Sequence, residues 1–319
     1  MRRVLLGQLS ARGDRRRPSR QVRLRARAAA RAGLKEPDSL RRASSPLRWA
    51  RKRVLNIGDS LAGLLRDSGS QDGPPIPPRW LRARTGTAEA LHYAEGGRAA
   101  LQELEGALAH TGASLQDARS VLDFGCGSGR VLSVLAERLP ASRLQGCDVD
   151  PAAIGWASRH LPPIGWTRSG FLPPLPFADA SFELIYSLSV LSHLAEADQD
   201  SWLVELARLL APGATALLSV HGPFAFDQFR KGVASTAWCP PSAFARGPLG
   251  DDEFVFEPYA RSLWNRAELG AIEGRFGLAF HGADYVRRHW PHALEVVTIL
   301  PRAVSEWQDL VVCTKAQTH

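Results

Sequence analysis

The sequence predicts an α/β fold with a doubly wound, mostly parallel sheet, and two observations support this. From residue 120 onward, short apolar runs alternate with helical stretches, which is typical of parallel strands joined by crossover helices. A glycine-rich turn directly follows the first apolar run, so that a helix is expected to begin where a strand ends. The 319 residues suffice for one large core with additions.

We expect residues 1–75 to form a basic arm and linker and residues 76–319 to form the folded domain. An Ala/Leu/Glu-rich segment over 87–112 predicts one or two helices before the core, as a helical N-terminal extension. Further along the chain, the predicted strands are 120–124, 143–148, 182–188, 215–221, 293–300 and 308–314. The predicted helices are 128–139, 151–160, 198–210 and 283–290.

Residues 222–280 break this alternation and are rich in Phe, Trp, Pro and Gly. We interpret them as an insertion after the fifth strand, with one helix over 262–276. Ligands of a doubly wound sheet bind beyond the carboxyl ends of its strands, so the insertion would overhang that site. Its aromatic residues would line an acceptor pocket or form a small core of their own. They are Phe224, Phe226, Phe229, Trp238, Phe244, Phe254, Phe256 and Trp264.

The positive charge is concentrated at the start of the chain. Residues 1–53 hold 16 Arg and 2 Lys against 3 acidic residues, so they carry +15, whereas the chain carries +8 and the remainder −7. The charge therefore does not indicate a nucleic-acid-binding core, although binding through the arm stays open. The arm has the composition of an organellar transit peptide, but its near-exclusive use of Arg over Lys favours a disordered tail or an over-long reading frame.

The remaining composition favours a cytoplasmic protein without a metal or disulfide framework. The four cysteines are widely spaced and include no C-x-x-C pair. Cys126 and Cys147 lie at predicted strand ends, where we expect small buried thiols. No apolar run approaches the length of a membrane helix, so we expect no membrane partner.

The segment from Asp123 to Arg130 carries the clearest chemical signal. Glycines at 125, 127 and 129 allow a tight bend and leave backbone N–H groups free near a helix start. A dinucleotide fingerprint would need Gly or Ala where Arg130 stands. S-adenosylmethionine has no pyrophosphate and bears a cationic sulfonium and an amino group, so the carboxylate of Asp123 suits it better than a nicotinamide cofactor.

A second carboxylate follows about 20 residues later, at the end of the second predicted strand. Asp148 is placed to accept hydrogen bonds from both ribose hydroxyls of a nucleoside. Asp150 is better interpreted as the N-cap of the helix that begins at Pro151.

These motifs resemble, in order and in sequence, those of class I S-adenosylmethionine-dependent methyltransferases. The resemblance covers about residues 78–315 and includes the segments 173–185, 205–213 and 309–315. The resemblance implies a Rossmann-like, seven-stranded sheet whose last strand is antiparallel, with S-adenosyl-L-methionine as the cofactor. Many members place an Asp or Asn near the adenine, where this chain has Gly170-Phe171-Leu172. The residues expected to bind the cofactor are Asp123, Gly125, Cys126, Gly127, Gly129, Asp148, Val149, Phe171, Leu172 and Ser187.

The catalytic residues are less evident, because methyl transfer depends on positioning and does not always need a general base. His193 and His221 follow the fourth and fifth strands and are candidates, with a structural role as the alternative for each. The amino-base signature Asn/Asp-Pro-Pro-Tyr/Phe and the Pro-Cys nucleophile are missing from the sequence. We therefore expect an O or N atom of a small-molecule or sugar-like acceptor. An RNA or protein methyltransferase that uses the basic arm, or a non-catalytic scaffold, is the alternative; the acceptor and oligomeric state stay open.

Overall fold

The computed structural model of the protein describes residues 74–85, 90–234, 241–259 and 274–316. All of them belong to one compact unit of the chain, Gly58–His319. The predicted arm and linker over 1–75 lies almost wholly outside the described residues, and its boundary stays a prediction. No described helix is both long enough and apolar enough to cross a bilayer.

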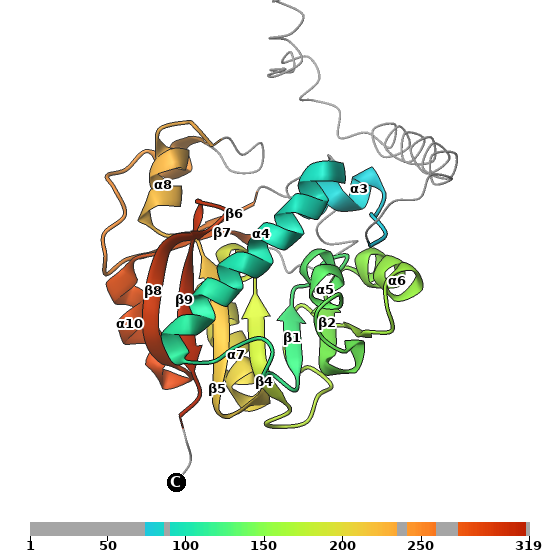
Figure 1. Cartoon of the computed structure of the whole chain (residues 1–319). Coiled ribbons are helices and arrows are strands. Elements are labelled where there is room, and N and C mark those ends of the chain that lie inside the picture. The colour runs from blue at the N-terminus through green and yellow to red at the C-terminus, as the bar shows by residue number, and fades with distance from the viewer. Residues whose placement is uncertain (1–73, 86–89, 235–240, 260–273, 317–319) are drawn as a thin grey trace, which may run out of the picture. The chain divides into compact units, whose positions relative to one another are not determined.

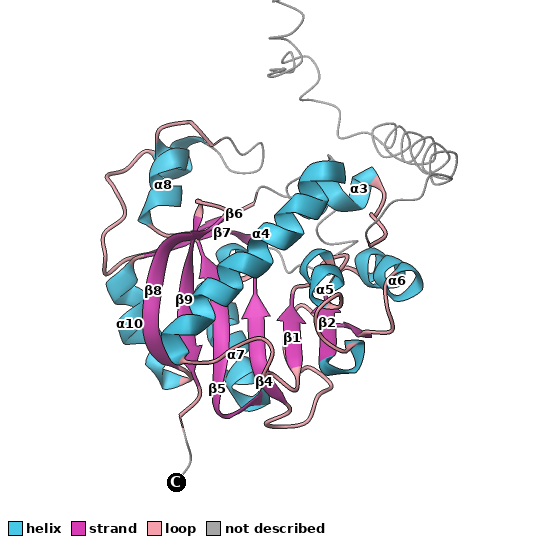
Figure 2. Ribbon diagram, viewed as in Figure 1, coloured by secondary structure: helices cyan, strands magenta, loops and turns pink. Residues whose placement is uncertain are grey.

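Seven strands form one sheet in the order β3-β2-β1-β4-β5-β9-β8 (Figure 2). The first five pair in parallel, whereas β9 is antiparallel to both β5 and β8. The prediction of a doubly wound sheet with an antiparallel last strand is confirmed. The strands are β1 Val121–Phe124, β2 Leu144–Asp148, β3 Gly165–Arg168, β4 Phe182–Ser187, β5 Leu210–Val220, β8 Glu295–Val304 and β9 Gln308–Thr314.

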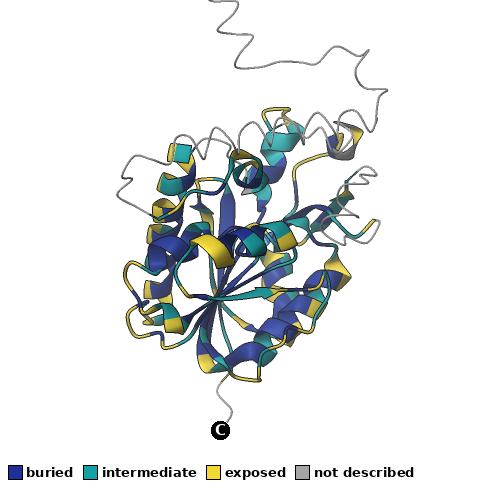
Figure 3. Ribbon diagram, turned by 90° about the vertical axis from the view of Figure 1, so that its right-hand side faces the viewer, coloured by how far each residue is buried: buried dark blue, intermediate teal, exposed yellow. Residues whose placement is uncertain are grey.

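Helices cover both faces of this sheet. Successive residues of a strand point to opposite faces, and neighbouring residues of β1 are buried in two different hydrophobic clusters. Val121 packs with helices α4 (Ala90–Leu108) and α5 (Arg130–Leu135), whereas Leu122 packs with α7 (Glu196–Leu209) and α10 (Ala283–His289). In Figure 1, α4 crosses in front of the sheet and α7 lies behind it. Figure 3 shows the buried residues gathered along the strands and the inward faces of the helices.

A smaller hydrophobic cluster lies between α6 (Pro151–His160) and the segment before the core. Leu81 from α3 (Arg79–Arg82) is buried against Ala153, Trp156 and Ala157 of α6. The segment before the core is therefore held on the side of the molecule where β2 ends.

Most predicted elements are present, but α5 and β5 differ from the prediction at one end, and β3 was not placed. Helix α5 ends at Leu135 rather than at 139, and the chain continues in turns. Pro140 disfavours the helical conformation of Leu139, the residue before it, so the helix does not extend to that point. β5 begins at Leu210, directly after α7, so Pro212 and Gly213 lie in the exposed start of the strand instead of before it. β3 was not predicted individually, since its four residues include no apolar run.

The insertion contains elements that the sequence did not predict: α8 (Pro223–Arg230) and the antiparallel pair β6 (Phe254–Pro258) and β7 (Gly277–His281). The helix predicted over 262–276 lies mostly outside the described residues, and its last three residues are not helical. Trp238 and Trp264 also lie outside them. The buried aromatic residues form a small core of the insertion, comprising Phe226, Phe244 and Phe280 with Ala225, Leu249, Val255 and Leu278.

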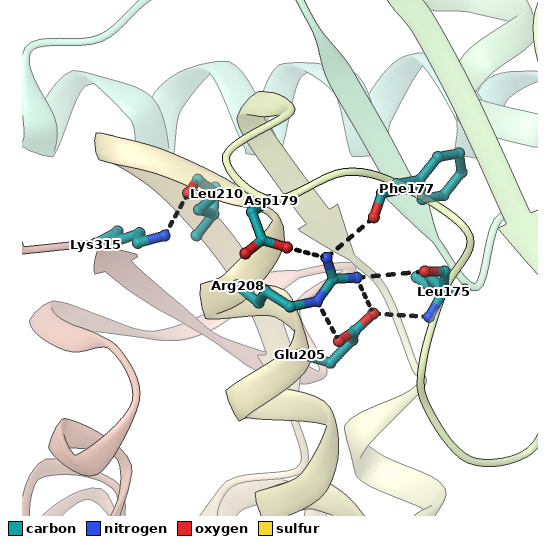
Figure 4. A network of polar contacts seen from close by, with 7 residues as sticks. All are labelled: Leu175, Phe177, Asp179, Glu205, Arg208, Leu210 and Lys315. Carbon is teal, nitrogen blue, oxygen red and sulfur yellow. Dashed lines mark hydrogen bonds and ion pairs between the residues drawn. The ribbon is translucent and has the colours of Figure 1, made fainter.

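A polar network fixes the loop that leads into β4 (Figure 4). Arg208 of α7 donates to the carbonyl oxygens of Phe177, at 3.0 Å, and Leu175, at 3.3 Å. It also pairs with Glu205 and Asp179, and Glu205 in turn accepts from the Leu175 backbone N–H at 2.7 Å. The two segments of the resemblance, 173–185 and 205–213, are therefore joined through one guanidinium.

Candidate active site

The glycine turn lies between the carboxyl end of β1 and the start of α5. Gly125, Gly127 and Gly129 have φ values of +84°, +56° and +81°, a region that favours glycine. A Cβ on Gly125 would lie 2.1 Å from Cγ2 of Val190, in the loop after β4. The turn thus needs glycine at position 125 for its backbone angle and for its close contact with that loop.

Asp148 ends β2, the strand beside β1, and its carboxylate faces the glycine turn. One oxygen, Oδ2, accepts from the backbone N–H of Gly127 at 2.7 Å, and Oδ1 accepts from that of Asp150 at 2.7 Å. A carboxylate has about four lone-pair positions, so acceptor capacity remains for a ligand. The expected proximity of Asp148 to the glycine turn is therefore present in the structure.

Asp150 is the N-cap of α6, as the sequence predicts. Its side chain accepts from the backbone N–H groups of Ala152 and Ala153 at 2.9 and 3.3 Å. Its other oxygen forms an ion pair with Arg84, which precedes the core. Arg84 is a residue of the site that sequence reasoning did not single out.

Two carboxyl groups near the turn have raised pKa values. Burial raises the pKa of Asp123 to about 8, and the nearby charge of Asp148 raises it further. Burial likewise raises the pKa of Asp148 to about 6, against the hydrogen bond from Gly127 and the charge of Arg84. A cationic ligand beside these groups would stabilise their ionised forms.

One unsatisfied polar atom lies at the end of β4. The hydroxyl of Ser187 is buried and has no hydrogen-bond partner within the described residues, whereas the hydroxyl of the preceding Tyr186 interacts with the Asp123 carboxyl group. Buried polar atoms are rarely left unpaired without a reason. Together with Asp123 and Asp148, the Ser187 hydroxyl fits a ligand that has a cationic group and hydroxyl groups, such as S-adenosylmethionine.

Helix α4 supplies a second residue that the sequence analysis missed. The hydroxyl of Tyr93 lies 2.9 Å from Oγ of Ser128, inside the glycine turn, and Tyr93 is buried. A Cβ on Gly97 would lie 2.6 Å from the carbonyl oxygen of Arg130, so this glycine lets α4 approach the start of α5. A Gly-Gly pair within a helical segment is the only signal in the sequence.

The structure also describes the other predicted cofactor residues. Cys126 is a buried free thiol of the turn, as predicted, and burial raises its pKa. Val149 and Leu172 are half-buried. Phe171 packs edge-on against Phe276, and its carbonyl oxygen accepts from Trp202 Nε1 at 3.2 Å.

The structure brings His193 and His221 together, with ring centroids 5.9 Å apart. Nδ1 of His193, in the short turn Leu191–His193, lies 2.9 Å from the carbonyl oxygen of Gly277 and 2.9 Å from the hydroxyl of Tyr259. Nε2 of His221 lies 3.3 Å from Nε2 of Gln308. Burial lowers the pKa of both histidines, so both imidazoles are neutral at neutral pH.

Gln308 connects the histidines to the ends of β4 and β5. Its Oε1 accepts from Ser219 at 2.7 Å, and its Nε2 donates to Ser189 Oγ at 2.9 Å. A cavity of about 220 Å³ lies elsewhere, at the amino ends of β4 and β5, and contains none of the predicted site residues. Within the described residues, no group of three or more His, Cys, Asp or Glu side chains could hold a metal ion.

Comparisons with known proteins match this architecture. A family model described as a methyltransferase domain matches residues 121–213. A trans-aconitate 2-methyltransferase from Azoarcus sp. (strain BH72) is 32% identical over 114 residues, which are 36% of this chain and 43% of that protein. One from Acidovorax sp. (strain JS42) is 30% identical over 198 residues, 60% of this chain and 67% of that protein.

Among solved structures, a similar one is the S-adenosylmethionine-bound amino pentose methyltransferase from Micromonospora echinaspora. The two chains have a TM-score of 0.44 and are 17% identical, and the match covers 72% of this chain and 97% of the Micromonospora chain. The chain spans about two fifths to one half of the length of the first curated relatives that it matches. On the match to the Acidovorax protein, supported by the family model, this chain belongs to the class I S-adenosylmethionine-dependent methyltransferase family.

Proposed function

We propose that this protein transfers the methyl group of S-adenosylmethionine to an oxygen or nitrogen atom of a small-molecule or sugar-like acceptor. The main support is the hydrogen bond from Gly127 to Asp148, which places a carboxylate against the glycine turn. When bound, S-adenosylmethionine supplies an electrophilic methyl group on its sulfonium. Asp148 would hold the ribose, and Asp123 would face the amino group.

The contribution of the protein is then mainly positional. The insertion contacts the segments that follow β4 and β5 through the bridges Leu194–Phe276 and His221–Phe280. Excluding water and aligning the acceptor with the methyl group supply much of the rate of such a displacement. His193 and His221 contact β7 of the insertion and are the candidates for accepting a proton from the acceptor.

Calorimetry with S-adenosylmethionine and S-adenosylhomocysteine tests the cofactor site. We expect both to bind, and no heat with either nucleoside at millimolar concentration would overturn the proposal. Incubation with methyl-labelled S-adenosylmethionine and a host extract then tests transfer. Label in a small-molecule fraction supports the proposed acceptor class.

The basic arm supports a second candidate, an RNA or protein methyltransferase. Residues 1–53 carry +15, and a polyanion held by such a segment dissociates steeply as salt rises. Deletion of residues 1–53 separates the two candidates. Methylation of a small molecule should survive the deletion, whereas methylation of a polyanion held by the arm should be lost.

A further inference from the structure

We infer that Gln308, in the last strand of the sheet, is a positioning residue for the cofactor: its side-chain amide holds Ser189 in a left-handed conformation, so that Val190 keeps its contact with the glycine turn. This inference rests on the proposed methyl transfer. It gives β9 a part in cofactor binding, although β4 and β5 separate β9 from β1. Three observations carry it: the backbone angle of Ser189, the hydrogen bonds around it, and the contact of Val190.

The loop after β4 begins with a strained residue. Ser189 has a φ of +61°, in the left-handed region that residues other than glycine disfavour. It comes two positions after Ser187, which ends β4 and is one of the expected cofactor residues. A residue in such a conformation persists where the surrounding structure holds it. The contacts of Ser189 therefore decide whether the loop keeps this shape.

Gln308 and Ser219 hold Ser189 through a closed ring of hydrogen bonds. The backbone N–H of Ser189 donates to Oγ of Ser219 at 2.8 Å, and the Ser219 hydroxyl donates to Oε1 of Gln308 at 2.7 Å. Nε2 of Gln308 completes the ring by donating to Oγ of Ser189 at 2.9 Å. Ser189 is exposed, whereas Ser219 and Gln308 are buried. The ring thus ties a surface residue to the buried ends of β5 and β9.

The amide of Gln308 also meets the residue that follows β5. Its Nε2 lies 3.3 Å from Nε2 of His221. The backbone carbonyl oxygen of His221 in turn accepts from the N–H of His281, in β7, at 2.8 Å. Gln308 therefore lies where the loop after β4, the end of β5 and the insertion come together.

The far end of the loop is anchored by a second buried amide. Nε2 of Gln199, in α7, donates to the carbonyl oxygens of Leu191 and Leu194 at 3.0 and 2.9 Å. Oε1 of Gln199 lies 2.8 Å from Nε2 of His281. These contacts do not involve Gln308. A substitution of Gln308 should therefore act mainly on the start of the loop.

Val190 connects the start of the loop to the glycine turn. A Cβ on Gly125 would lie 2.1 Å from Cγ2 of Val190, so the two residues pack directly against each other. The backbone N–H of Gly125 donates to the carbonyl oxygen of Cys147 in β2 at 2.8 Å, which fixes the turn to the sheet. If Ser189 leaves the left-handed region, the chain changes direction at Val190. The contact with the fixed turn is then lost.

Loss of the amide should weaken cofactor binding by a predictable factor. The left-handed region is disfavoured for a residue other than glycine by a factor of roughly 5 to 30. When only a fraction of the molecules has the binding-competent loop, the apparent dissociation constant rises by the reciprocal of that fraction. Gln308→Met keeps the length of the side chain but removes the amide. We expect it to bind S-adenosylhomocysteine roughly 5- to 30-fold more weakly than the wild type.

Calorimetry with S-adenosylhomocysteine on the full chain measures this affinity, and urea denaturation measures the stability of each variant. Thr215→Val is the matched control, because it removes a buried hydroxyl and its 3.3 Å hydrogen bond to Thr111, four residues before Ser219 in β5. Both variants should be less stable, but only Gln308→Met should lose affinity. Ser219→Ala breaks the same ring with a smaller change, so it tests the inference if Gln308→Met does not fold. It should also bind more weakly.

A Ser189→Gly background distinguishes positioning from a general structural role. Glycine adopts the left-handed conformation about as readily as other backbone angles, so it does not need the amide to hold it there. Adding Gln308→Met to Ser189→Gly should therefore cost much less affinity than Gln308→Met costs in the wild type.

Each outcome of these titrations is decisive. Wild-type affinity in a folded Gln308→Met or Ser219→Ala would overturn the inference. An equal loss of affinity in the Ser189→Gly background would also overturn it, because the amide would not act through Ser189. An equal loss in Thr215→Val would trace the effect to stability instead. Failure of the wild type to bind S-adenosylmethionine or S-adenosylhomocysteine would remove the proposed function itself, so the two failures are distinguishable.

Discussion

Replacing Asp148 with Asn should change stability and affinity in opposite directions. Burial raises the pKa of this carboxyl from 3.8 to about 6. Between these values the folded state binds a proton more tightly than the unfolded chain, so the free energy of unfolding falls as the pH rises through that window. At about 1.36 kcal/mol per pKa unit, the ionised carboxylate destabilises the ligand-free protein by up to roughly 3 kcal/mol at pH 7.

The neutral amide of Asn removes that cost but satisfies fewer donors. Its oxygen can accept from only one of the two backbone N–H groups, Gly127 or Asp150, that Asp148 now satisfies. An unsatisfied N–H costs about 1–3 kcal/mol. We therefore expect the ligand-free variant to be more stable by up to about 2 kcal/mol at pH 7, and its stability to depend less on pH between 4 and 6 than that of the wild type.

The same substitution should weaken nucleoside binding. Losing one charge-assisted hydrogen bond to the ribose costs about 1.5–3 kcal/mol, or roughly 10- to 200-fold in the dissociation constant. Urea denaturation at several pH values measures the stability, and calorimetry with S-adenosylhomocysteine at pH 8 measures the affinity. Asp179→Asn, at an exposed ion pair with Arg208, is the control and should change neither by more than about 0.5 kcal/mol. Unchanged affinity in Asp148→Asn, or a less stable ligand-free protein, would refute the reasoning.

Three further substitutions test the turn, α4 and the insertion. Gly125→Ala should abolish detectable S-adenosylhomocysteine binding in calorimetry, because its Cβ would strike Val190 and its φ is +84°; retained affinity would contradict the close contact. Tyr93→Phe should lower the free energy of unfolding by about 0.5–1.5 kcal/mol through loss of the bond to Ser128, measured in urea, and no change would mean that this bond contributes nothing. Arg275→Met leaves the buried Asp198 carboxylate unpaired and should cost about 3–5 kcal/mol, measured by denaturation at pH 7. An unchanged free energy of unfolding in Arg275→Met would mean that the ion pair with Asp198 contributes nothing.

The sheet was predictable because its signals are local. Each of β1, β4 and β9 contains an apolar run beside a turn, and Asp150 precedes a Pro at the first helical position, so the N-cap and the helix start are visible in the sequence. The glycine turn and Asp148 were predictable for the same reason. Their separation of about 20 residues corresponds to one helix between neighbouring parallel strands.

The remaining parts of the site depend on contacts between residues far apart in the chain. Tyr93 meets Ser128 across 35 residues, and His193 meets Gly277 across 84. No periodicity or motif encodes such pairs. In the insertion, β6 and β7 escaped prediction because they pair across an intervening segment rather than through a tight turn.

The attachment of His193 to the start of β7 separates two kinds of evolutionary change in this protein. The glycine turn and Asp148 lie between Asp123 and Asp150, whereas the carbonyl oxygen bonded to His193 belongs to a segment more than a hundred residues later. Under the proposed function, exchanging the insertion would therefore change the surroundings of the acceptor, while the segment with the glycine turn is inherited unchanged.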